Sequence, residues 1–109
     1  MSTRRHRYSC AWCGRDIVDS SVGRRRKYCR QSCRQRAYEQ RSLTAGTSIA
    51  DDAVILSAVE AEALLDRLFS LRCAAEDLAT AIDEQAGHDE LSQLCAALVE
   101  QARAAERVR

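Results

Sequence analysis

Two pairs of cysteines with a basic loop between them are the residues of this sequence best suited to do chemistry. Two residues separate Cys10 from Cys13, three separate Cys29 from Cys33, and fifteen lie between the pairs. Thiolates at such spacings are typical of a structural zinc site, because a tetrahedral ion needs four soft ligands on one small sphere. Gly14 permits a tight turn after the first pair, and one helical turn can place both sulfurs of the second pair on one face. The four cysteines are therefore the predicted ligands of one structural zinc ion.

Such a site leaves no room for a substrate on the metal. A catalytic zinc keeps one coordination position open, whereas four thiolates close the shell. The sequence also lacks a Gly-rich phosphate loop, the His-x-Glu of a deaminase, and a Ser, His and Asp set in any recognisable context. A Cys-x2-Cys redox centre is the best enzymatic alternative, but its usual strand–helix–strand setting is missing. We predict that the protein is not an enzyme.

The cysteine-rich segment resembles a known family. The Cys-x2-Cys-Gly motif, the basic loop and the run YCRQSCRQRAY (residues 28–38) look like a treble-clef zinc finger over about residues 8–41. The cysteine spacing is similar to that of the small zinc-binding DNA gyrase inhibitors, although these usually have Pro where this chain has Ala11. The tail after Cys33 is more like the short fingers common in actinobacterial proteins. The resemblance implies a small zinc-stabilised α+β fold in which the four cysteines hold the ion.

Charge divides the chain into two halves, which the net charge of +1 conceals. Residues 1–42 hold twelve Arg or Lys and three Asp or Glu, a net charge of +9. Residues 43–109 hold five and thirteen, a net charge of −8. A cationic segment beside an anionic one marks the first as the candidate for binding nucleic acid, and we favour DNA over RNA as its partner.

The basic residues have a pattern that suits phosphate contacts. Residues 24–27 are four consecutive cations, and Arg30, Arg34 and Arg41 can share much of a helical face with Tyr38 beside them. Like charges this dense repel one another, and a phosphate backbone would relieve that repulsion and release counterions. The alternative is an ordinary solvated surface. The predicted nucleic-acid-binding residues are Arg4, Arg5, Arg7, Arg24, Arg25, Arg26, Lys27, Arg30, Arg34, Arg36, Tyr38 and Arg41.

We expect residues 1–42 to form a basic, treble-clef-like α+β module. Residues 16–19 predict a short strand, residues 20–23 a turn, and residues 24–28 a second strand that returns toward the metal. The module has few apolar residues, so metal binding must supply much of its folding free energy. In zinc-finger peptides the apparent binding free energy is about 10 to 16 kcal/mol.

The acidic half has helical periodicity. After a linker at 43–48, in which Gly46 ends the basic helix, apolar residues recur in steps of three and four over a predicted helix at about 49–86. Gly87 interrupts the pattern, and a second amphipathic helix is predicted at about 90–109. The short connection predicts an antiparallel helical hairpin.

The first of these helices is predicted to be much longer than the second, so part of its apolar stripe lacks cover within the hairpin. Such a unit is a poor monomer. We expect a homodimer, a protein partner, or docking against the chain's own zinc module. The predicted interface residues are Val54, Ile55, Val59, Leu64, Leu65, Leu68 and Leu71.

Cysteine use and hydropathy also indicate a cellular location. Six cysteines in a short chain would suit a secreted disulfide framework, but no apolar export signal follows the basic start, and no stretch is long enough to span a membrane. We expect a cytoplasmic protein with reduced thiols, with neither a membrane nor a small-molecule partner. Cys73 and Cys95, outside the zinc site, are expected to behave as small buried apolar residues.

Two functions fit these patterns. In the first, the finger and its basic arm bind DNA or RNA, and the acidic helices oligomerise a small regulator. In the second, the helical hairpin docks on a large nucleic-acid-processing machine such as a polymerase, gyrase or ribosome, and the finger acts within that assembly. Salt-dependent binding to free nucleic acid would support the first.

Overall fold

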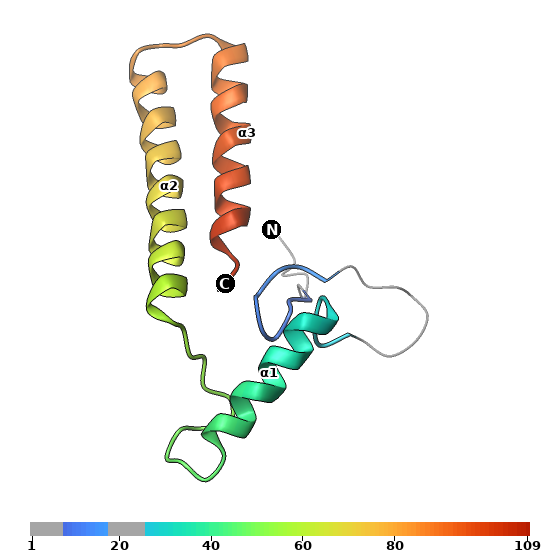
Figure 1. Ribbon diagram of the computed structural model, residues 1–109. Helices are drawn as coiled ribbons and strands as arrows, with labels where there is room; N and C mark the ends of the chain where they lie inside the picture. Colours follow the sequence, from blue (N-terminus) through green and yellow to red (C-terminus); the bar gives the residue numbers. More distant parts are fainter. Residues whose placement is uncertain (1–7, 18–25) are drawn as a thin grey trace. The chain divides into compact units, whose positions relative to one another are not determined.

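The computed structural model describes residues 8–17 and 26–109 (Figure 1). Helices in these residues are α1 (Gln31–Thr44), α2 (Ala58–Asp83) and α3 (His88–Ala105). The chain divides into two compact units. The first unit runs as far as Leu56 and also includes Val108 and Arg109, and the second unit, here called the helical hairpin, runs from Ser57 to Arg107.

The first cysteine pair lies on a tight turn closed by backbone hydrogen bonds. The Gly14 N–H donates to the carbonyl of Cys10 over 2.9 Å, and the Cys10 N–H donates to the carbonyl of Arg15 over 2.8 Å. On either side of the turn Ser9 and Asp16 form an antiparallel bridge. Gly14 has a φ of +83°, a conformation that side chains rarely adopt, so its predicted role in the turn is confirmed.

The predicted β-hairpin is not seen in the described residues, where β structure is limited to the bridge between Ser9 and Asp16. Asp16 was expected to begin a strand facing residues 24–28. It pairs with Ser9 instead, because the tight turn brings the two sides of the first cysteine pair together. Residues 18–25, which hold most of the predicted hairpin, lie outside the described residues. The described fold is thus mostly helical, with a cysteine cluster.

One face of helix α1 packs against the rest of the first unit. Cys33 and Thr44 are buried, and Ala37 and Gln40 between them are half-buried, at the three- and four-residue steps of a single helical face. The helix ends as predicted before Gly46, whose φ of +79° turns the chain away from the helical path.

Helix α2 begins at Ala58, not at residue 49, so the predicted start was wrong. Ser57 and Glu60 form a complete capping box, in which each side chain accepts from the other residue's backbone N–H. A helix beginning at residue 49 would instead have Asp51 at the reciprocal position of its box, where Glu or Gln is the usual residue. The preceding residues bond instead to the first unit: the Gln40 side chain donates to the carbonyl of Ala53, and Arg109 donates to that of Ile55.

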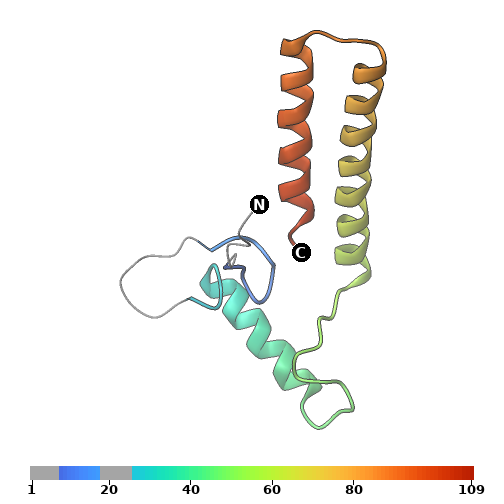
Figure 2. The same cartoon turned by 180° about the vertical axis from the view of Figure 1, so that it is seen from behind.

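The expected antiparallel hairpin is confirmed, since α2 and α3 lie side by side in both views (Figures 1 and 2). Gly87 is the residue before α3, which starts at His88 rather than at residue 90, so Asp89 lies in the first turn. There its charge suits the positive end of the helix. α3 ends at Ala105 rather than at 109, because Val108 and Arg109 belong to the first unit.

The helical hairpin has a thin interior. Ala81 is its one buried residue among those described, and the seam is otherwise made of half-buried side chains. On α3 this seam includes Leu91, Leu94 and Leu98, which are half-buried on one face, as expected of an amphipathic helix. With 26 residues in α2 and 18 in α3, the helices are about 39 and 27 Å long, so their lengths differ less than predicted.

The predicted interface residues fall into three groups. Val54 and Ile55 precede α2 and belong to the first unit. Leu64 and Leu71 are half-buried within the hairpin, whereas Val59, Leu65 and Leu68 are exposed by 74%, 64% and 44%. Within the described part of the chain, none of the helices is both long and apolar enough to cross a membrane.

Candidate metal centre

Four cysteine sulfurs converge in the first unit. The Sγ atoms of Cys10, Cys13, Cys29 and Cys33 all lie within 4.8 Å of one another. The Cys29 Sγ lies 3.6 Å from that of Cys13 and 3.7 Å from that of Cys33. These distances are too long for a disulfide, whose sulfurs are about 2.05 Å apart. They are close to the roughly 3.8 Å that metal–sulfur bonds of about 2.3 Å impose at the corners of a tetrahedron. The predicted ligand set is therefore brought together and can hold one metal ion.

Local structure explains how the two pairs meet. The first pair lies on the tight turn, Cys29 lies just before α1, and Cys33 lies in the first turn of that helix. The Ala11 N–H donates to the carbonyl of Lys27 over 2.9 Å, which joins the tight turn to the segment before the second pair. Partly buried aromatic residues pack against this cluster, namely Tyr8, Trp12 and Tyr28.

The thiols of the cluster have divergent acidities. Burial raises the pKa of the Cys10 thiol, but neighbouring hydrogen-bond donors, chiefly backbone N–H groups, outweigh burial and lower the pKa to about 6. Burial also raises the pKa of the Cys13 thiol, but hydrogen bonds donated by Arg15 help to lower it below its usual value. At Cys33 burial, together with hydrogen bonding and repulsion from the other thiolates, raises the pKa to about 12. Four negative sulfurs at these distances repel one another, and a bound cation would relieve that repulsion.

Two arginines lie beside the sulfurs. Arg15, which the sequence did not single out, donates hydrogen bonds to Cys13 from its backbone and side chain. Arg30 was predicted to bind nucleic acid, and its hydrogen bond to Cys29, helped by the charges of the thiolates, raises the pKa of its guanidinium. Both cations offset part of the negative charge that the cluster carries when its thiols ionise.

The chain's last two residues contact the tight turn, and nothing in the sequence pattern pointed to this. The N–H groups of Val108 and Arg109 donate to the carbonyl of Cys13 over 2.7 and 3.3 Å. Arg15 donates to the carbonyl of Arg109 over 3.2 Å. The Arg109 guanidinium lies 3.6 Å from the centre of the Trp12 ring, within the range of a cation–π contact. These contacts bind the end of the chain to the candidate metal centre.

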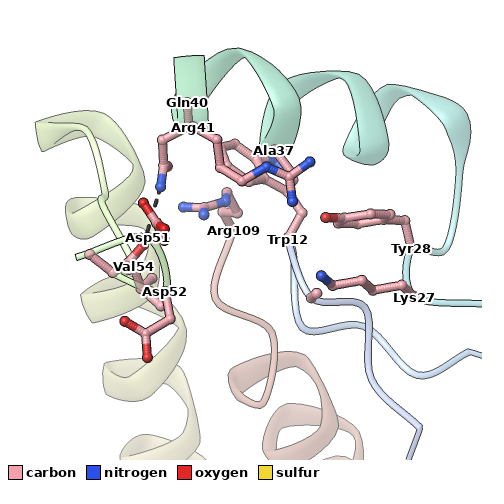
Figure 3. A pocket seen from close by; sticks show the side chains of 12 residues that line it. Trp12, Lys27, Tyr28, Ala37, Gln40, Arg41, Asp51, Asp52, Val54 and Arg109 are labelled. Atoms are coloured by element: carbon pink, nitrogen blue, oxygen red, sulfur yellow. Dashed lines mark hydrogen bonds between the residues drawn. The ribbon is translucent and has the colours of Figure 1, made fainter. Parts of the chain in front are cut away.

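A cavity of about 250 Å³ lies next to the turn, inside the first unit. Figure 3 shows Lys27 and Tyr28 on one side of it, Asp51 and Asp52 on the opposite side, and Arg109 between them. Trp12 and Arg41 complete its aromatic and charged lining. The cavity was not predicted, because its walls come from five separate stretches of sequence.

The predicted nucleic-acid-binding residues are only partly described. Arg4, Arg5, Arg7, Arg24 and Arg25 lie outside the described residues. The others are exposed, and Tyr38 shows 61% of its surface. On α1 their spacing places Arg34, Tyr38 and Arg41 on a common face next to the buried one. We call this exposed face the cationic face of α1.

Comparisons with protein-family models, with curated proteins and with solved structures find no match to this chain.

Proposed function

We propose that this chain is a non-catalytic, zinc-stabilised protein that binds nucleic acid through the first unit. The observation that carries the proposal is the start of α1: the helix begins at the four converging sulfurs and carries exposed cations away from them. A metal at its first turn would fix the direction of the helix, and hence the spacing of its cations. Zinc is the ion that best suits four thiolates in a small, closed site.

The proposed fold of the first unit is treble-clef-like. A cysteine turn followed by a helix that begins at the second cysteine pair supports this assignment. A β-hairpin between the pairs would complete the fold.

The cationic face of α1 supports binding to phosphates. Arg34 and Arg41 flank Tyr38 on that face, and residues 26–44 carry six Arg or Lys against one Glu. Cations held on one helical face can follow a phosphate backbone, and their counterions are released on binding. DNA is the proposed partner, in a regulator that works where cysteine thiols stay reduced, as in the cytoplasm.

The test combines metal analysis with salt-dependent binding. We expect one zinc per chain after purification, and anisotropy titrations of duplex and single-stranded DNA that weaken linearly in log–log form between about 50 and 200 mM salt. Changing Arg34 and Arg41 together to Ala should flatten the slope by up to about 2, since each phosphate contact contributes about 0.9. The control is the pair Arg72→Ala and Arg103→Ala in the helical hairpin. An absence of measurable affinity for both DNA and RNA would refute the proposal.

A second candidate function is favoured by the exposed apolar side chains of the helical hairpin. Leu65, Leu68 and Phe69 are all exposed on α2, at spacings that bring them onto neighbouring parts of one face. Such a face suits a second copy of the hairpin or the surface of a larger assembly. Changing Leu65 and Leu68 to Asp should convert an oligomer to a monomer, or abolish capture of a partner, while Asp66→Ala should do neither. A wild-type native mass of one chain, without a captured partner, would contradict this function.

A further inference from the structure

The cavity beside the tight turn has the size of a site for one flat ring system. Its volume of about 250 Å³ is below the roughly 300 to 1,000 Å³ of sites for drug-sized ligands. The lining combines two aromatic rings with cations and carboxylates, the groups that a polar ring system would contact. All of its lining residues belong to the first unit.

Stacking surfaces are already in place. Trp12 and Tyr28 line the cavity, and the guanidinium of Arg109 both lines it and lies against the Trp12 ring. Unpaired bases stack on aromatic rings and on guanidinium planes. Arg109 is held by three sets of hydrogen bonds, from its N–H to Cys13, from Arg15 to its carbonyl, and from its Nη1 to the carbonyl of Ile55. Because Arg109 is already held in place, little of the free energy of binding a stacked base would be spent on ordering this side chain.

The polar groups of the cavity are divided by charge. Lys27 lies on the side opposite Asp51 and Asp52 (Figure 3). A cation suits the phosphate of a nucleotide, whereas a carboxylate accepts hydrogen bonds from an exocyclic amino group. Cytosine and adenine carry such a group on the base edge, and thymine and uracil do not. Arg41 belongs both to the cavity lining and to the cationic face of α1, so a strand along that face can reach the cavity.

We propose that this cavity binds one unpaired, amino-bearing nucleobase of a single-stranded nucleic acid, stacked beside Arg109 and read by the carboxylates of Asp51 and Asp52. The inference rests on the proposed function, since the same cations hold the strand. It adds a preference for single strands and for cytosine or adenine over thymine.

The experiment uses Trp12 as a built-in reporter, because it is the chain's single tryptophan. The zinc-loaded full chain is titrated with oligonucleotides of dC, dA or dT about five nucleotides long, within the roughly 4 to 16 nucleotides of single-strand sites. We expect dC and dA to change Trp12 fluorescence and to bind about tenfold more tightly than dT, because good base contacts discriminate by about 1 to 3 kcal/mol.

Variants separate the two parts of the site. Asp51→Ala with Asp52→Ala removes the acceptor oxygens and should abolish the preference for dC over dT. Arg109→Ala should weaken dC binding about tenfold, whereas Arg103→Ala, which lies in α3, should leave it unchanged. Zinc content is measured for each variant. If Arg109→Ala loses its metal, the variant at Asp51 and Asp52 still tests the proposal, because both side chains are exposed and their replacement should not disturb the fold.

The outcomes distinguish the inference from the function on which it rests. Salt-dependent DNA binding without a Trp12 signal, or with equal affinity for dC and dT, overturns the inference and leaves the proposed function standing. A failure to bind any nucleic acid overturns both. A Trp12 signal with preference for dC or dA, lost in the Asp pair, supports both.

Discussion

The first unit buries Cys10, Cys13, Ile17 and Cys33, whereas the helical hairpin, among its described residues, buries only Ala81. Three of these four residues are cysteines whose thiols can hold a metal ion, and Thr44 is the other buried residue in the described part of this unit. In the hairpin, stability is spread along a seam of half-buried residues on α2 and α3. Neither unit has a conventional apolar core, and each has a different replacement for one.

This difference teaches how single changes should act on each unit. A metal site is cooperative, because the loss of one ligand weakens the hold on the ion and leaves the other three thiolates crowded together. In a seam of half-buried contacts the loss of stability is incremental, because each side chain contributes a modest share of the apolar burial. We therefore expect a single ligand substitution to unfold the first unit, and single substitutions in the seam to lower the stability of the hairpin by small amounts.

The largest expected effect is the loss of a ligand. Cys33→Ser should release the metal and unfold the first unit, because finger peptides draw about 10 to 16 kcal/mol of folding free energy from zinc. The hairpin should stay helical. Amide hydrogen exchange checks this: protection should disappear at residues 31–44 of α1 and persist in α2 and α3.

Cys95→Ser is the matched control for that change, since Cys95 is exposed on α3, so its predicted burial was wrong, and it is not in the cluster. Its metal content and exchange pattern should equal those of the wild type. If Cys33→Ser kept zinc and protection in α1, the distinction between a metal-held and a seam-held unit would be lost.

A smaller effect is expected in the seam. Leu98→Ala should lower the free energy of unfolding of the hairpin by about 2 kcal/mol, at the low end of the range for Leu→Ala because Leu98 is only half-buried. Val99→Ala is the neighbouring control, since Val99 is 51% exposed and should change stability little. Denaturant titrations measure both, with zinc content unchanged. Equal losses at the two positions would show that Val99 is covered in solution, as expected of an interface.

The cysteine cluster could be predicted from the sequence because a metal site would impose short, fixed spacings on its ligands. Cys10 and Cys13 share one turn, and Cys29 and Cys33 are within one helical turn of each other. The hairpin was predictable for a similar reason, since each helix shows its periodicity locally. In both cases the physical cause acts over a few residues.

Contacts between distant parts of the chain could not be predicted in this way. Arg15 and Arg109 are 94 residues apart, and neither lies in a motif. Their contacts with Cys13 depend on how the whole first unit closes. The cavity depends on the same closure, because Arg109 forms part of its wall.

The prediction that α2 begins at residue 49 was wrong for the same reason. The periodicity that predicted a helix from residue 49 was overridden where Ala53 and Ile55 bond to the first unit through Gln40 and Arg109. Local helical preference is worth only tenths of a kcal/mol per residue, so a few tertiary contacts and a better cap decide where the helix begins.

The smallest expected effect sharpens the boundary between the units. Ser57→Ala removes the hydroxyl that accepts from the Glu60 N–H, and should cost the hairpin about 1 kcal/mol, a typical value for an N-cap. Ser48→Ala is the matched control, since a helix beginning near residue 49 would need Ser48 as its cap, whereas the observed chain is not helical there. Thermal unfolding of both variants measures the difference. If Ser48→Ala lowered the stability and Ser57→Ala did not, residues 49–57 would belong to the hairpin helix. The first unit would then lack the segment that carries Asp51 and Asp52.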